Sequence, residues 1–371
     1  MKLIGLLLIV LISLPVSAQR NIERVGQQWN TDKENRIVDL DEIVALLPRD
    51  RIPPIDDPNY WDIERAGKTF FDHEPVMVVD IEGDARAYPL SILMWHEIVN
   101  DVIAGKPVSI TYCPLCNAAI VFDRRLEHEG EELLLDFGTS GMLRKSDLVM
   151  WDRQTETWWQ QLTGEGIVGD LAGAELTMVP SLLISFEEFT ESYPDGKVLS
   201  TETGAQRDYG ANPYERYDDL DVDQPRLFDG EVDDRLPAME RVINISAQGN
   251  HIVYPLSKIQ EAEVINDEPF GKPIVIFYQK GTVSVLDTPD IKDGRDVGAV
   301  SVFDPVVNEE RLTFRKTDDG FIDDQTGTRW NISGKGIDGE LQGTQLSWIF
   351  HGNHFAFAWL AFHPETEIYG Q

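Results

Sequence analysis

The sequence has few cysteines and few basic residues, and each shortage excludes a class of protein. Only 2 of its 371 residues are cysteine, which excludes a scaffold stapled by several disulfides and a four-cysteine metal site within one chain. Lys and Arg number 32 against 65 Asp and Glu, which gives a formal net charge of −33. Such a surface repels phosphates and anionic lipids, so we expect no nucleic-acid partner, and a cationic partner is the remaining electrostatic option.

Long apolar runs are also scarce, and the first one lies at the start of the chain. Lys2, the apolar stretch Leu3–Leu14 and the small residues Val16-Ser17-Ala18 have the order of a signal peptide covering residues 1–18. The stretch is shorter than the roughly 20 residues that cross a bilayer, and no later segment is apolar enough to do so. We therefore expect an exported, soluble protein, periplasmic or secreted, with no membrane span.

A diverged internal repeat organises the rest of the chain. Tyr88–Ser91 recurs as Tyr254–Ser257, and Glu97–Asp101 matches Glu263–Asp267. Three further pairs of segments match, namely Gly105–Pro107 with Gly271–Pro273, Asp152–Trp159 with Asp323–Trp330, and Gly164–Gly173 with Gly334–Gly343. Matches at this density predict an internal duplication that gives two similar lobes.

The predicted fold class is α+β and β-rich, with mostly antiparallel strands. Short runs of Val, Ile, Phe and Tyr alternate with Gly, Asp and Asn turns throughout both lobes. We expect about one helix per lobe, at Ser91–Val99 and Ser257–Ile265, and a third helix at Ser185–Tyr193 that Ser185 caps. The predicted organisation is a signal peptide (1–18), an N-terminal extension (19–65), lobe one (66–180), a helix with an acidic linker (181–235), and lobe two with a C-terminal segment (236–371).

The two lobes differ at three places, all of which carry polar or reactive residues in lobe one. The segment Cys113–Cys116 becomes Gln279–Thr282, and His96 becomes Ala262. Lobe one also inserts Gly138–Asp147 before its next strand. Duplicated lobes share the residues that fold them, so features confined to one lobe predict that the functional site lies in lobe one.

The cysteine pair lies between two strand-like runs, Val108–Tyr112 and Asn117–Phe122. A thioredoxin-type pair instead opens a helix, whose dipole lowers the thiol pKa. A pair in a turn between strands is similar to the knuckles of rubredoxins and zinc ribbons. A tetrahedral site needs further ligands, and histidine has to supply them in the absence of a second cysteine pair. The candidate ligands are Cys113, Cys116, His96, and His354 or its neighbours His351 and His363.

Soft sulfur combined with imidazole suits Zn²⁺ or copper. With three protein ligands the fourth position would be open, and metal-activated water could then hydrolyse a substrate with Glu97 or Asp147 as the base. Ser140, Arg144 and Ser146 belong to the inserted segment, which we expect to be a flexible loop that contacts a cofactor or a substrate. The sequence names neither a small-molecule nor a protein partner. A histidine such as His96 on an apolar helix face is equally typical of a core residue.

Several motifs together resemble domain-of-unknown-function family 3179. They are Arg86–Leu90, Trp95–Asp101, Tyr112–Cys116, Phe137–Gly141, Ser146–Met150, Asp152–Thr155, Asp208–Gly210, Asn212–Tyr214 and Phe357–Trp359. The resemblance covers the chain from about residue 50 to its end. It groups the fold but implies no activity, so the chemistry rests on the residues.

Two other functions remain open beside a metal-binding protein. The first is a thiol–disulfide redox protein, which the spacing of Cys113 and Cys116 and an oxidising compartment would permit. The second is a non-enzymatic binding protein in which the two cysteines form a structural disulfide, as is usual for one cysteine pair in an exported chain. So short a loop would gain little stability from the cross-link.

Overall fold

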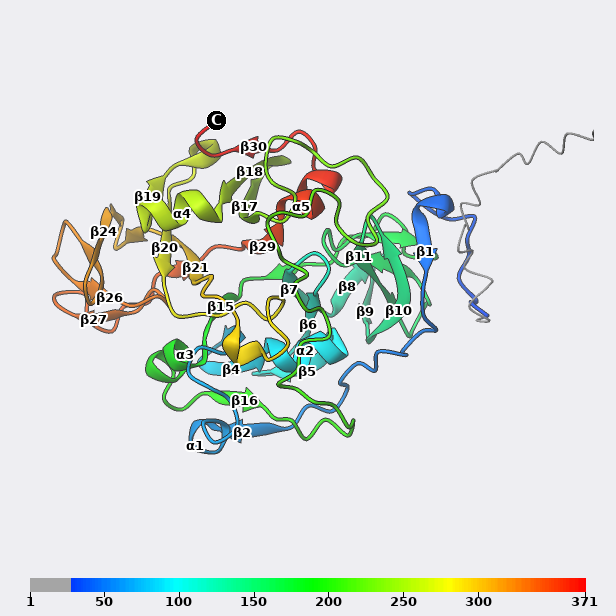
Figure 1. The fold of residues 1–371 in the computed structure, drawn as a ribbon, viewed down its shortest axis with the longest axis horizontal. Helices are drawn as coiled ribbons and strands as arrows, with labels where there is room; N and C mark the ends of the chain where they lie inside the picture. Colours follow the sequence, from blue (N-terminus) through cyan, green and yellow to red (C-terminus); the bar gives the residue numbers. More distant parts are fainter. Residues whose placement is uncertain (1–27) are drawn as a thin grey trace, which may run out of the picture.

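The computed structural model describes residues 28–371, so the predicted signal peptide at 1–18 lies outside the described residues. Figure 1 shows many short strands with a few short helices between them. The strand pairs are antiparallel except for two parallel pairs, β16 (Lys197–Leu199) with β4 (Asp84–Pro89) and β18 (Asn250–Pro255) with β30 (Glu367–Ile368). The β-rich α+β class predicted from the sequence is confirmed.

In lobe one, a hairpin leads through a helix into two further groups of strands. The hairpin pairs β3 (Pro75–Ile81) with β4, and α2 (Leu90–His96) follows it. The next group contains β5 (Ile98–Ile103), β6 (Lys106–Cys113), β7 (Ala118–Asp123) and β14 (Met178–Val179). The last contains β10 (Phe137–Arg144), β11 (Asp147–Asp152), β12 (Trp158–Gln160) and β13 (Gly166–Val168), and β1 (Ile43–Ala45) of the N-terminal extension pairs with β10. Residues Pro107–Cys113 of β6 are all buried, so both faces of the cysteine-bearing strand are covered.

Lobe two follows the same order of elements. Its strands and helix are β17 (Arg241–Ala247), β18, α4 (Leu256–Ala262), β19 (Val264–Asp267), β20 (Ile274–Gln279), β21 (Ala299–Asp304), β24 (Phe314–Thr317), β25 (Gly320–Asp323), β26 (Arg329–Trp330) and β27 (Gly336–Asp338). Individual contacts also match, because Asp152 and Asp323 each accept the indole N–H of a buried tryptophan, Trp159 or Trp330, at 2.9 Å. These contacts fall where the sequence repeats, while the duplication of whole lobes stays a prediction.

Two strands join the lobes. β15 (Leu182–Ser185) pairs with β3 of lobe one and, at Leu183, with β21 of lobe two. The C-terminal strand β29 (Gly352–Phe355) pairs with β17, and the N–H of Phe355 donates a hydrogen bond of 2.9 Å to the carbonyl of Cys116. The C-terminal segment of the chain therefore lies directly beside the cysteine turn. The remaining strands of the described residues are β2 (Tyr60–Asp62), β8 (Arg125–His128), β9 (Glu131–Leu134), β22 (Val306–Val307), β23 (Glu310–Arg311) and β28 (Ser347–Trp348).

The three helices predicted from the sequence are confirmed. α2 and α4 each end three residues early because Glu97 and Glu263 adopt positive φ angles of 59° and 58°, which stops the helical turn. α3 (Phe186–Ser192) begins at a capping box in which Ser185 accepts from the N–H of Glu188. Two further helices, α1 (Ile63–Ala66) and α5 (Ala356–Phe362), are not predicted from the sequence, and the continuous apolar run of α5 shows no helical period.

The expectation of a flexible loop at Gly138–Asp147 is wrong. Most of this segment is strand β10, which pairs with β11 through a two-residue turn at Lys145 and Ser146. Both turn residues have positive φ angles, 52° and 68°, as a tight hairpin turn requires. Gly141 permits a bulge in β10, because a Cβ atom there would lie 2.1 Å from the carbonyl oxygen of Leu47.

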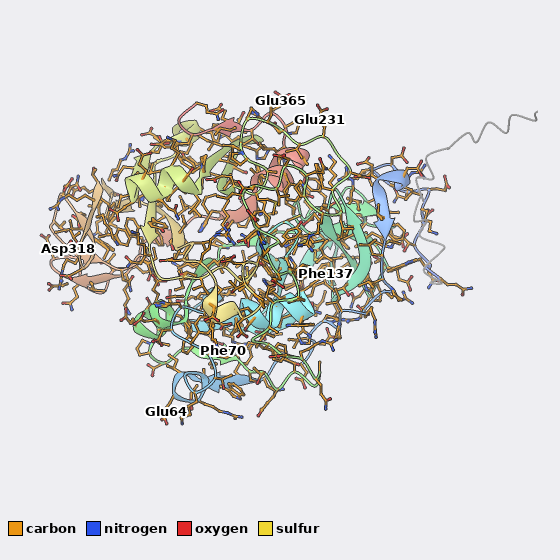
Figure 2. All side chains as sticks on the ribbon, viewed as in Figure 1. Glu64, Phe70, Phe137, Glu231, Asp318 and Glu365 are labelled. Carbon is orange, nitrogen blue, oxygen red and sulfur yellow. The ribbon has the colours of Figure 1, made fainter. Side chains whose placement is uncertain are left out.

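The charge is distributed as the composition predicts. Figure 2 shows the acidic side chains Glu64, Glu231, Asp318 and Glu365 at the periphery, while Phe137 lies inside the molecule. Across residues 28–371, none of the helices has the length and apolar character needed to cross a membrane.

Candidate metal centre

The two cysteines lie at the turn that joins β6 and β7, with Cys113 at the end of β6 and Cys116 within the turn. Cys113 ends β6, where it pairs with Ala118 across the hairpin. The N–H of Cys116 donates to the carbonyl of Cys113 at 3.2 Å, and the N–H of Asn117 donates to Pro114 at 3.3 Å. The prediction that the pair sits in a turn between strands is confirmed.

The second element of the site is the hairpin of β10 and β11. Asp147 is the first residue of β11, and its side chain is fully buried. Its Oδ2 atom accepts hydrogen bonds from Gln160 Nε2 at 2.6 Å and from the N–H of Leu162 at 2.9 Å. Its Oδ1 atom is buried and has no hydrogen-bond partner of standard geometry, although the two neighbouring thiols lower the pKa of the carboxyl as hydrogen-bond donors do. An unpaired buried carboxylate oxygen is costly, so this atom is poised to receive a proton or a cation.

The two hairpins bring two thiols and a carboxylate together. One Sγ atom from each of Cys113 and Cys116 and one carboxylate oxygen of Asp147 all lie within 4.8 Å of one another. The exposed fractions of the three residues are 2%, 0% and 0%, and both cysteines are free thiols. Within residues 28–371 this is the one group of three or more His, Cys, Asp or Glu side chains with metal-ligand spacing.

Burial dominates the electrostatics of this group. It raises the pKa of both thiols, and the charge of Asp147 raises them further. Burial likewise raises the pKa of Asp147 to about 6, although the hydrogen bond from Gln160 opposes the shift. Glu97, at the end of α2, has its pKa raised to about 8 by burial and by the charge of Asp147. Four acidic groups therefore share a region where a negative charge is costly unless a cation compensates it.

The structure does not bring the two predicted histidine ligands into this group. His96 lies on α2 with both ring nitrogens engaged, Nδ1 at 2.7 Å from the carbonyl of Pro53 and Nε2 at 2.8 Å from the hydroxyl of Tyr209. His354 belongs to the strand beside the cysteine turn, but its ring stacks on Trp359 with a centroid distance of 5.2 Å. Burial lowers its pKa to about 3, so this histidine is neutral at physiological pH.

The remaining predicted site residues have structural contacts. Ser140 is buried and donates to the carbonyl of Val149, and Arg144 pairs with Glu42 at 2.8 Å. Ser146 is buried beside the thiols, where its carbonyl lies 4.0 Å from Cys113 Sγ. Of these three predicted cofactor contacts, only Ser146 therefore borders the cluster.

Lobe two has no equivalent cluster. Gln279 occupies the position that follows the strand tyrosine, as Cys113 does in lobe one, and its side-chain oxygen accepts from Lys316 Nζ. Lys316 is attracted by the charge of Glu263, the counterpart of Glu97. In lobe two, the amide of Gln279 and the ammonium of Lys316 therefore lie where lobe one has its thiols and carboxyls. This difference agrees with the prediction that the functional site lies in lobe one.

Sequence reasoning missed two sets of residues around the cluster. Gln160 orients Asp147, yet nothing in the sequence distinguishes it from a surface glutamine. Tyr112 and Asn353 hold Asn117, the residue after the second cysteine, through contacts of 3.3 Å and 3.0 Å to its side chain. Asn353 comes from β29, so only the fold places it near the turn.

Comparison with known proteins identifies a family but no activity, ligand or partner. The family model described as protein of unknown function (DUF3179) matches residues 49–366. No curated protein and no solved structure matches the chain. Because the model covers most of the sequence, the chain belongs to the DUF3179 family.

Proposed function

We propose that this protein binds a single metal ion through Cys113, Cys116 and Asp147. The observation that supports this function best is the unpartnered Oδ1 atom of Asp147, buried in a group whose three ligand atoms lie within 4.8 Å of one another. A cation there would compensate the thiolates and the carboxylate together, whereas ionising these buried acids without a metal is costly. Glu97 is the proposed fourth donor, because its charge acts on Cys113 and Asp147; its carboxylate lies outside the group of three ligand atoms, so it has to move towards the ion.

Zn²⁺ is the favoured ion and copper the alternative. Zn²⁺ accepts a mixed set of thiolates and carboxylates in tetrahedral geometry, while Cu⁺ prefers sulfur ligands alone. The residues present fit such an ion, with sulfur from one hairpin and oxygen from the other.

Binding rather than catalysis is proposed for this site. A catalytic metal keeps one position open to substrate, whereas a structural metal is enclosed by protein. Cys113, Cys116 and Asp147 are at most 2% exposed, so protein encloses the three ligand atoms. In this proposal Asp147 and Glu97 are therefore ligands and not bases.

A thiol–disulfide exchange function has one observation in its favour, which is that both cysteines are free and adjacent. Exchange requires an accessible thiolate, and these thiols are buried with raised pKa values. The structure thus offers the redox function less support than the metal function. A disulfide across so short a turn would also stabilise the fold little by chain entropy.

Titration with Co²⁺ under reducing conditions tests the proposal. Thiolate-to-metal charge-transfer absorption should saturate at one ion per chain and disappear in Cys113→Ser. His96→Gln and His354→Gln are matched controls, because they remove the histidines that the cluster excludes and should leave the spectrum unchanged. A spectrum lost in either histidine variant but kept in Asp147→Ala would refute the proposed ligand set.

We also propose that the protein is exported, on the strength of residues 1–18 alone. Mass spectrometry of the protein recovered from the periplasm or medium should show a mature chain beginning at Gln19. Recovery of the uncleaved chain from the cytosol would contradict export.

A further inference from the structure

A long segment without helix or strand covers the cysteine cluster. It runs from residue 200, after β16, to residue 240, before β17, and we call it the strap. Figure 1 shows it as the green to yellow-green coil that winds across the molecule. Connections this long without secondary structure are uncommon in compact domains, and those that are ordered usually have a function.

The strap closes over the two hairpins that hold the cluster. The hydroxyl of Tyr217 donates to the carbonyl of Leu115, the residue between the cysteines, at 3.0 Å. On the other hairpin, Ser146 Oγ donates to the carbonyl of Arg226 at 3.2 Å. Tyr217 is 97% buried by these neighbours, and the Arg226 guanidinium lies 5.4 Å from its ring centroid. One part of the strap therefore contacts both sources of the metal ligands.

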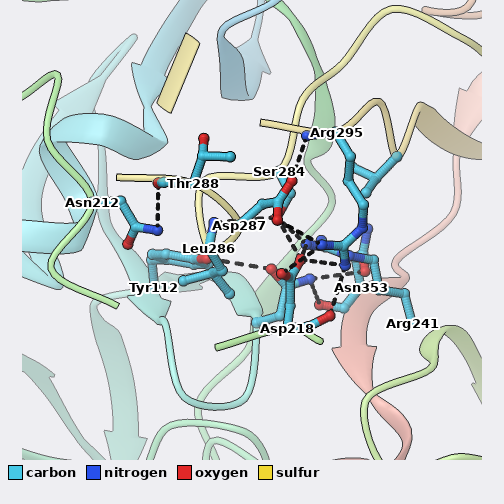
Figure 3. Close-up of polar contacts among 12 residues, drawn as sticks. Tyr112, Asn212, Asp218, Arg241, Ser284, Leu286, Asp287, Thr288, Arg295 and Asn353 are labelled. Atoms are coloured by element: carbon cyan, nitrogen blue, oxygen red, sulfur yellow. Dashed lines mark hydrogen bonds and ion pairs between the residues drawn. The ribbon is translucent and has the colours of Figure 1, made fainter. Parts of the chain in front are cut away.

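A buried ion-pair network fastens the strap to lobe two. Asp218, the residue after Tyr217, is completely buried and accepts from Arg241 at 2.9 Å, Arg295 at 2.8 Å and Ser284 Oγ at 2.6 Å. Figure 3 shows Asp218 beside Arg241, Arg295 and Ser284, with dashed lines for the contacts that join them. The N–H of Tyr217 also donates to the carbonyl of Leu286 at 3.0 Å. These anchoring groups belong to lobe two and to the strap, and none of them is a proposed metal ligand.

We propose that the strap is a gate over the Cys113–Cys116–Asp147 cluster, and that the Asp218 network sets how often the gate opens. Access to the sulfurs requires Tyr217 to leave Leu115. Because Tyr217 and Asp218 are adjacent in the chain, that movement pulls on the carboxylate held by Arg241 and Arg295. The role of the gate in metal exchange rests on the proposed metal function. Its role in controlling access of a reagent to the thiols is independent of that function.

Two rates measured on the full chain test the gate. The first is transfer of Zn²⁺ from the loaded protein to a chromogenic chelator, and the second is reaction of the metal-free protein with a chromogenic disulfide reagent. In Asp218→Asn both rates should rise at least tenfold, since each follows the population of the open form. Tyr217→Phe, which removes only the hydroxyl bond to Leu115, should raise both rates several-fold while preserving the fold.

Asp221→Asn is the matched control, because it removes an exposed acid from the same strap and should leave both rates at the wild-type value. Equal rates in wild type, Asp218→Asn and Tyr217→Phe would overturn the gate. Faster thiol labelling in a protein that binds no Zn²⁺ would support the gate and refute the metal function. Stoichiometric Zn²⁺ binding with unchanged rates in both strap variants would support the metal function and refute the gate.

Discussion

Replacing Asp147 by Asn tests whether the buried acids of the cluster cost stability when no metal is bound. Asn is isosteric, and its side-chain oxygen can still accept from Gln160 and from the N–H of Leu162. The substitution therefore removes one negative charge and leaves the packing of the hairpin unchanged. The expected result is a metal-free protein that is more stable than wild type and a metal affinity that is much weaker.

The magnitude follows from the pKa of Asp147, which burial raises from 3.8 to about 6. A carboxyl whose pKa is raised by folding stabilises the protein below its unfolded pKa and loses that contribution as pH rises through the folded pKa. Each pKa unit corresponds to about 1.4 kcal/mol, so the ionised Asp147 destabilises the metal-free fold at pH 7.5 by roughly 3 kcal/mol. At about 2 °C per kcal/mol for a chain of this size, Asn should raise the Tm of the chelated protein by ~6 °C.

Thermal unfolding at pH 7.5, with and without Zn²⁺, measures both effects. Wild type should gain stability from Zn²⁺ by mass action, while Asp147→Asn should gain little. At pH 4 the stability advantage of Asp147→Asn should largely vanish, because Asp147 is then protonated in wild type. A metal-free Asp147→Asn protein that is less stable than wild type at pH 7.5 would refute the reasoning.

Three further predictions concern the surroundings of the cluster. Gln160→Met should weaken Zn²⁺ binding by roughly 10–100-fold in a competition titration, since it frees the proposed ligand Asp147, whereas Gln154→Met on the surface should not. The free energy of unfolding should fall as pH drops from 6.5 towards 3, because burial lowers the pKa of His354 to about 3. In this pH range the histidine is protonated in the unfolded chain and neutral in the folded one, which favours unfolding. Urea unfolding at several pH values should show a shallower fall in His354→Phe. Gly141→Ala should cost about 3 kcal/mol or more in urea unfolding, since its Cβ would lie 2.1 Å from a carbonyl oxygen, against about 1 kcal/mol for Gly130→Ala, which has an open surrounding and a similar φ.

The elements whose signals are local could be predicted from the sequence. The strands on either side of Cys113 and Cys116 follow from β-branched runs, and the start of α3 follows from Ser185 as its cap. The ends of α2 and α4 could not be predicted, because glutamate at a positive φ angle is not a usual helix stop.

The proposed metal ligands show more clearly what cannot be predicted from the sequence. The sequence identifies Cys113 and Cys116 because the second lobe lacks them, and it predicts Asp147 as a functional residue in the role of a base. Asp147, and not a histidine, lies beside the thiols. Its position depends on the direction that β11 takes after the turn at Lys145 and Ser146. His354 lies next in sequence to Phe355, which bonds to Cys116, but alternation along a strand sends its side chain away to Trp359.

The inserted segment and the strap illustrate a second limit. Gly138–Gly141 has the composition of a loop, but pairing with β1 and β11 makes the segment a strand. Tyr217 and Asp218 lie in an acidic stretch that reads as a solvated linker, yet both are buried against residues far along the chain. Contacts with residues far along the chain decide whether such segments become strands or are buried. Composition alone does not predict these contacts.

The most direct test of the account is the metal content and thiol state of the protein isolated from its natural compartment. Elemental analysis combined with native mass spectrometry should find one Zn²⁺ or copper ion per chain, and two free thiols after chelation and unfolding. The Cys113→Ser, Cys116→Ser double variant should contain no metal. A wild-type protein that has no metal after supplementation, with its two cysteines joined in a disulfide, would contradict the central claim.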